Sequence, residues 1–147
     1  MKPLVCEALW TTQPSRTEKW LMWLPIIGWT FAAALEQARF RPMVRTIEQQ
    51  LRERPDTSEH WGADPPRQEI AAAVRSLIAE ELGWPNDHFI PEDPFGIAFW
   101  GHQQGCEDVQ TIMRIEEHFS FRFPDSEWER FWRHGTLGEF VERLIRT

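Results

Sequence analysis

Residues 105–119 of this 147-residue chain read GCEDVQTIMRIEEHF. The apolar residues of this stretch recur at intervals of three and four, the spacing that places side chains on one face of an α-helix: Val109, Ile112, Ile115 and Phe119. Glycine is an acceptable residue at a helix start because it permits tight turns. The stretch therefore predicts an amphipathic helix that begins close to Gly105.

Three more helices are predicted around this one. Before it, Asp64 is placed to cap a helix that has Pro65 in its first position, and Gly83 is placed to end that helix. Its apolar stripe consists of Ile70, Val74, Leu77 and Ile78. After residue 119, two pairs have the spacing of a capping box at the start of a helix: Ser126 with Glu129, and Thr136 with Glu139.

The order of four short motifs resembles a known family. They are PEDPF at residues 91–95, the stretch at 105–119, FPD at 123–125 and TLGEFV at 136–141. The acyl carrier protein family has roughly P-E-D-S-F, D-S-L-D-x-V-E-L-V-M-x-L-E-E-x-F, I-P-D and T-V-G-D-x-V in this order. The resemblance covers about residues 67 to 146, with longer segments before Gly105 and around the third helix. No segment alternates as a strand, so we expect an all-α helical bundle. The resemblance implies that this bundle is acyl-carrier-protein-like.

Gly105 occupies the position of the family's phosphopantetheine-bearing serine. The resemblance therefore implies a carrier-like module in which 4′-phosphopantetheine is absent, since glycine has no hydroxyl for it. The resemblance also implies a protein partner with a basic docking surface, contacted by residues of the second helix: Glu107, Val109, Met113, Glu116 and Glu117. On a helical wheel Glu116 lies between Val109 and Met113. This mixed edge suits a docking surface, and a solvated helix face explains it equally well.

The charge distribution argues against a nucleic-acid partner. The chain has 16 Lys and Arg against 23 Asp and Glu, and the whole net charge of −7 arises from Arg67 onward. Affinity for nucleic acid depends on cationic side chains that release counterions. We therefore expect no nucleic-acid binding.

Enzymatic chemistry has little support in the sequence. His102 and Cys106 are four residues apart, a spacing that suits a metal site or a base–thiol pair, but no third ligand or orienting group stands nearby. Glycine-rich phosphate loops and the H-E-x-x-H and G-x-S-x-G motifs are missing from the sequence. We expect a protein that is not an enzyme and holds no metal.

The front of the chain has a different character. Residues 20–35 contain no charged residue and include Trp20, Trp23 and Trp29. Ser15 and Glu18 have capping-box spacing before them, and Pro25 should kink the helix. Sixteen helical residues span about 24 Å, which is short of the ~30 Å hydrocarbon core of a bilayer. Three interpretations stay open: packing on the bundle or in a homodimer, contact with a membrane surface, or a cleaved secretory signal.

The organisation that follows has two parts. Residues 1–66 form a Trp-rich helical extension and linker, within which Pro42 opens a second helix that ends near Arg54. Residues 67–147 form the carrier-like domain. The leading hypothesis is a cytoplasmic, non-enzymatic binding module. One alternative is a peripheral membrane protein that acts through residues 15–40, and another is a genuine carrier with an unrecognised attachment site.

Overall fold

A computed structural model describes residues 1–6, 27–100 and 107–146 of the chain, and of residues 27–39 and 107–109 it describes the backbone alone. These residues divide between two compact units. One unit consists of Met1–Leu4 and Glu48–Thr147, and the other of Val5–Ile47. Residues 48–66, which the sequence analysis assigned to the extension, thus belong to the same unit as the predicted bundle.

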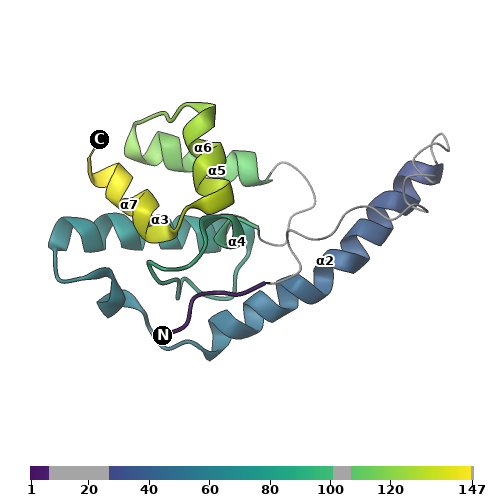
Figure 1. Cartoon of the computed structure of the whole chain (residues 1–147), viewed down its shortest axis with the longest axis horizontal. Coiled ribbons are helices and arrows are strands. Elements are labelled where there is room, and N and C mark those ends of the chain that lie inside the picture. Colours follow the sequence, from purple (N-terminus) through teal and green to yellow (C-terminus); the bar gives the residue numbers. More distant parts are fainter. Residues whose placement is uncertain (7–26, 101–106, 147) are drawn as a thin grey trace. The chain divides into compact units, whose positions relative to one another are not determined.

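The unit formed by residues 5–47 contains most of a long helix. Helix α2 spans Ile27–Glu53 and contains Pro42 in its interior (Figure 1). The prediction that Pro42 opens a new helix is therefore wrong. Proline has a φ that a helix accepts and costs one backbone hydrogen bond, and a helix that is already nucleated can continue past it. The Thr46 hydroxyl donates to the Pro42 carbonyl over 2.9 Å, one turn further on.

The other unit is a helical bundle. After the short 3-10 helix η1 (Ser58–Trp61) come α3 (Pro65–Leu82), α4 (Phe95–Ala98), α5 (Glu107–Phe119), α6 (Asp125–His134) and α7 (Leu137–Ile145). Helix α3 packs against α5 and α7, and α4 packs against α6 and α7 (Figure 1). The only β-type pairing among the described residues is an isolated bridge between Pro94 and Thr136. The all-α, acyl-carrier-protein-like fold is confirmed.

The helix ends test the capping predictions. Gly83 ends α3 in the left-handed conformation, with φ of 70°, as expected. Thr136 and Glu139 form the predicted capping box of α7. The capping box predicted at Ser126 is wrong, because α6 begins at Asp125 and has Pro124 as its N-cap. The chain enters the helix two residues earlier than an N-cap at Ser126 requires, and no side chain caps it.

Aromatic rings fill the core where α4, α6 and α7 meet. The ring of Phe95 stacks on that of Phe99, with centroids 4.1 Å apart, and lies 5.0 Å from the ring of Phe140 and 5.7 Å from that of Phe131. None of these four side chains exposes more than 1% of its surface. Such rings bury much apolar area and gain further from tilted and edge-on contacts. This cluster therefore holds the C-terminal helices together.

Candidate functional site

Two of the recognised motifs lie side by side in the structure. Three backbone hydrogen bonds join residues 91–95 to residues 135–138: Phe95 N–H to Gly135 O (2.9 Å), Leu137 N–H to Asp93 O (3.0 Å) and Gly138 N–H to Pro91 O (2.8 Å). The PEDPF loop therefore pairs with the segment that begins α7. This pairing places the start of α4 and the start of α7 next to each other.

The glycine of the TLGEFV motif has a steric role in this pairing. A Cβ atom at Gly138 would lie 2.9 Å from Pro91 Cβ and 3.0 Å from Pro91 O. A real Cβ atom essentially never comes within 2.9 Å of a neighbouring heavy atom, so a larger residue would require the two segments to shift. Glycine at position 138 is required by close packing.

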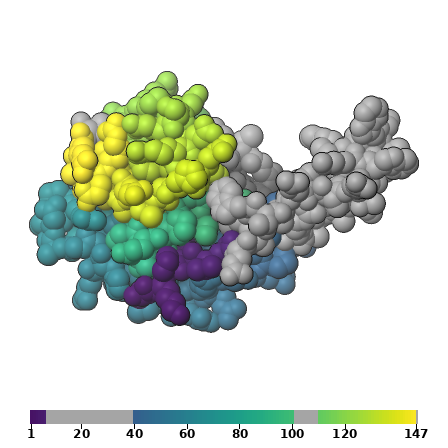
Figure 2. Space-filling view, in the orientation of Figure 1, coloured from purple at the N-terminus to yellow at the C-terminus, as the bar shows by residue number. Residues whose placement is uncertain are grey.

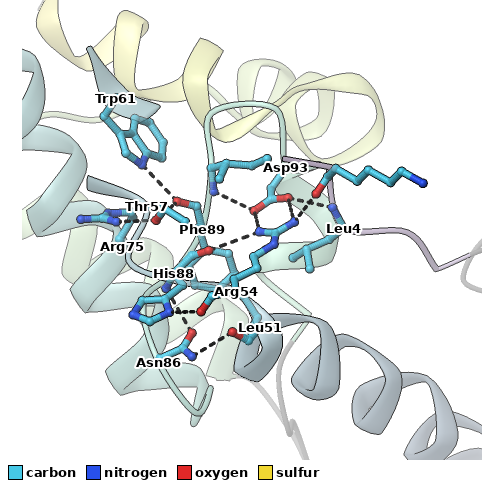
Figure 3. A network of polar contacts seen from close by, with 12 residues as sticks. Leu4, Leu51, Arg54, Thr57, Trp61, Arg75, Asn86, His88, Phe89 and Asp93 are labelled. Carbon is cyan, nitrogen blue, oxygen red and sulfur yellow. Dashed lines mark hydrogen bonds and ion pairs between the residues drawn. The ribbon is translucent and has the colours of Figure 1, made fainter. Parts of the chain in front are cut away.

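Asp93, the aspartate of the PEDPF motif, is fully buried, and both of its carboxylate oxygens accept hydrogen bonds (Figure 3). Arg54 donates to Oδ2 over 2.6 Å and to Oδ1 over 2.9 Å. The backbone N–H groups of Leu4 and Ile90 donate to Oδ1 and Oδ2 over 2.8 Å and 2.9 Å. An ionised carboxylate has about four lone-pair sites, and here all four have donors. Asp93 is thus a structural anion with no lone pair left for acid–base chemistry.

Arg54 connects three segments that are distant in sequence. Besides Asp93, its guanidinium donates to the carbonyls of Lys2 (2.8 Å) and His88 (3.2 Å), and its own carbonyl contacts His88 Nδ1 at 2.9 Å. Since a carbonyl only accepts, Nδ1 is the donor in the last contact. The first residues of the chain therefore lie against the 86–93 loop (Figure 2).

A second group of contacts extends this network to α3. The carbonyl of Phe89 accepts from Thr57 Oγ1 (2.8 Å) and from Trp61 Nε1 (3.1 Å). Arg75 of α3 donates in turn to Thr57 Oγ1 over 2.9 Å. Thr57 and Trp61 are 0% and 1% exposed. Residues that the sequence analysis treated as linker are thus part of the core.

The predicted attachment position lies outside the described residues, and the side chains at the start of the predicted docking helix are not described. Gly105 and Cys106 fall outside the described residues, as do Trp20, Trp23 and His102. For Glu107, Val109 and Trp29 only the helical backbone is described. What the structure places are the later residues of α5. Met113 has 62% of its surface exposed and Glu117 is exposed too.

Glu116 differs from its neighbours on α5 because its carboxylate has partners within the bundle. Its Oε1 accepts from Trp128 Nε1 over 3.1 Å and from the backbone N–H of Phe123 over 3.3 Å. Glu116 can therefore lie between apolar residues on the helix because its carboxylate has hydrogen-bond partners inside the bundle. Glu116 ties α5 to the loop after it and to α6, while Met113 and Glu117 project to the surface.

With this helix order and these paired motifs, the chain is similar to an acyl carrier protein. It is 25% identical over 77 residues to the acyl carrier protein of Thermosynechococcus vestitus, a match that covers 52% of this chain and 93% of that one. No family model matches the chain, and no solved structure matches it. The similarity thus supports an acyl-carrier-like relationship for about half of the chain.

Sequence reasoning missed Arg54 and the role of residues 1–4. Arg54 appeared only as the last residue before Pro55, with no partner in its vicinity along the chain. A basic residue at a helix end usually needs no explanation beyond the helix dipole.

Among the described residues no group of three His, Cys, Asp or Glu could hold a metal ion. No helix in the described part of the chain has both the length and the apolar content needed to cross a bilayer.

Proposed function

We propose that the protein is a non-enzymatic, acyl-carrier-like interaction module that carries no phosphopantetheine arm. The proposal rests on the motif resemblance, which puts Gly105 at the position of the family's serine, and it is supported by a match that covers 93% of the length of a carrier protein. The all-α bundle supports it. A prosthetic arm needs a side-chain oxygen for its phosphodiester, and glycine offers none.

Other hydroxyl groups near α5 are poor substitutes. Ser120 follows the last residue of α5, where the negative end of the helix dipole disfavours a phosphate. Thr111, within α5, is fully buried. A transferase must reach its target from solvent and attach a negative group to it, and neither position allows both.

The docking surface in this proposal consists of Met113 and Glu117. An exposed methionine beside an exposed carboxylate suits a partner surface that combines an apolar hollow with a basic rim, because methionine adapts to irregular apolar surfaces. Glu116 contributes by holding α5 in place rather than by contacting the partner. The acidic charge of the domain attracts basic partners over longer distances.

The attachment question is tested by intact mass after co-expression with a phosphopantetheinyl transferase. We expect no added mass on the native chain and the mass of one arm on the Gly105→Ser variant. An arm on the native chain would refute the proposal. Failure to load Gly105→Ser, with a known carrier loaded in parallel, would show that residue 105 is not the position that corresponds to the serine.

The docking surface is tested by affinity capture followed by titration of the partner found. Met113→Lys and Glu117→Lys should each weaken binding. Glu80→Lys makes the same charge change as Glu117→Lys at an exposed position of α3 and should not. Equal losses in all three variants would indicate general charge attraction. Binding that survives both α5 substitutions would remove this helix from the proposal.

A further inference from the structure

A groove of about 740 Å³ lies between the first turn of α3 and the facing sides of α6 and α7. All of its lining residues belong to the bundle, and none lies on α5. Small-molecule sites commonly have volumes of roughly 300–1,000 Å³, so this groove has the size of a ligand site. It is separate in sequence and in structure from the docking helix.

Charged side chains dominate the groove. Arginines line it at four positions: Arg67, Arg130, Arg143 and Arg146. Three carboxylates, those of Glu127, Glu139 and Glu142, and the side chain of His134 line it as well. With histidine neutral the lining has a positive formal charge, in a protein whose net charge is −7. The groove therefore carries a net positive charge, although the protein as a whole is negatively charged.

The three carboxylates are already engaged. Glu142 pairs with Arg67 at 2.7 Å and so joins α7 to α3. Glu127 pairs with Arg143 at 3.4 Å and joins α6 to α7. Glu139 accepts from the Thr136 N–H in the capping box of α7. These contacts join the helices that form the walls of the groove.

Two of the four arginines lining the groove do not take part in such ion pairs. Among the described residues, neither Arg130 nor Arg146 has a carboxylate partner, and both are exposed. The guanidinium of Arg130 lies over the ring of Phe131, 4.8 Å from its centroid, which restricts its position on α6. An exposed guanidinium presents several N–H donors in a planar fork that fits phosphate and carboxylate oxygens.

We propose that this groove binds a small, multiply charged anion through Arg130 and Arg146. The ligand carries clustered phosphate or carboxylate oxygens, since these are the groups that guanidinium forks bind in pairs. Arg67 and Arg143 contribute positive potential from the walls while they hold the helices together. This site does not depend on docking at α5 or on the missing arm.

The test uses isothermal titration calorimetry on the full chain at low and at physiological salt, with pyrophosphate and citrate as probes. We expect saturable binding of at least one probe, and the preferred probe identifies the ligand as a phosphate or a carboxylate compound. The double variant Arg130→Gln/Arg146→Gln should lose about tenfold or more in affinity. Because both side chains are exposed, the variant should keep the native circular dichroism spectrum and melting temperature.

Arg133→Gln is the control for the loss of an exposed arginine on α6 outside the groove. Arg133 is on α6 as well, is exposed, pairs with Glu129 at 2.8 Å and does not line the groove. Its replacement removes one positive charge nearby and should leave affinity unchanged. The proposal is overturned if neither probe binds saturably, or if Arg133→Gln weakens binding as much as the double variant does. Binding that disappears at physiological salt in the native chain would overturn it as well, since surface attraction alone is screened there.

Discussion

The guanidinium of Arg54 lies against the carboxylate of Asp93 in a two-point ion pair, with N–O distances of 2.6 Å and 2.9 Å. The two side chains come from positions 39 residues apart and are 7% and 0% exposed. A buried carboxylate is stable only while its charge and its lone pairs have partners. The pair therefore makes the end of α2 part of the same folded unit as the PEDPF loop.

Replacing Arg54 should be strongly destabilising. In Arg54→Met the Asp93 carboxylate stays buried without its cation, and we expect a loss of about 3–5 kcal/mol in the free energy of unfolding. Urea denaturation followed by tryptophan fluorescence measures it. Arg52→Met removes the same charge from an exposed position of α2 and should cost well under 1 kcal/mol, on the order expected for surface sites. Equal effects in the two variants would show that the buried pair has no special role.

The two capping predictions had different outcomes, and mutation should separate them as well. Thr136→Ala removes the side chain that accepts from Glu139 N–H and should cost roughly 0.5–2 kcal/mol. Ser126→Ala removes an exposed hydroxyl that caps nothing and should be near neutral. Thermal unfolding of both variants provides the comparison. A larger loss in Ser126→Ala than in Thr136→Ala would contradict the assigned start of α6.

Gly138→Ala tests the close approach of α7 to the PEDPF loop. The added methyl group would meet Pro91 Cβ at 2.9 Å and Pro91 O at 3.0 Å, and we expect a loss of about 1–3 kcal/mol from overpacking. Alanine normally stabilises a helix relative to glycine by up to about 1 kcal/mol. The sign of the change in the denaturation midpoint is therefore informative, and a stabilised variant would show that the two segments can separate without cost.

Trp61→Ala tests whether residues 55–66 belong to the core. Trp61 is 1% exposed and donates to the Phe89 carbonyl, so its truncation should cost about 3–5 kcal/mol. His60→Ala, one residue earlier and exposed, serves as the control and should change stability little. Were this segment only a linker, the two variants would have equal denaturation midpoints.

Asp56 has a pKa below its ordinary value because the Ser58 hydroxyl donates to it over 2.7 Å and the Ser58 N–H over 3.0 Å. A lowered carboxyl pKa contributes stability above the pKa of the unfolded chain, and this stability is lost as pH falls through the folded value. Ser58→Ala removes the larger cause and should raise the pKa of Asp56 part of the way back. An NMR pH titration measures the shift, with Ser76→Ala as a control that should leave the Asp56 curve in place.

The sequence alone predicted the helices α3, α5, α6 and α7 and their order. Periodic apolar residues, Gly83 after α3 and the Thr136–Glu139 pair before α7 act within a few residues of the chain, so their effect can be predicted without tertiary contacts. The same local rules led to two errors. Pro42 lies within α2 rather than at a helix start, and Ser126 caps nothing. Short-range signals indicate where a helix is able to begin, while the surrounding chain determines whether it does.

Only the tertiary structure decided which polar residues serve the fold. Glu116 was predicted as a docking residue from its place on the helix, and the structure adds that its carboxylate accepts hydrogen bonds from Trp128 and from the chain after α5. Arg54 was predicted only as the end of a helix, and in the structure it compensates a buried acid from another part of the chain. Both outcomes depend on donors that are distant in sequence and are brought within 3.5 Å by packing. Hydrogen bonds and ion pairs act at such short range that a local pattern predicts them within a helix turn, as at Thr136 and Glu139, and not between segments that only packing brings together.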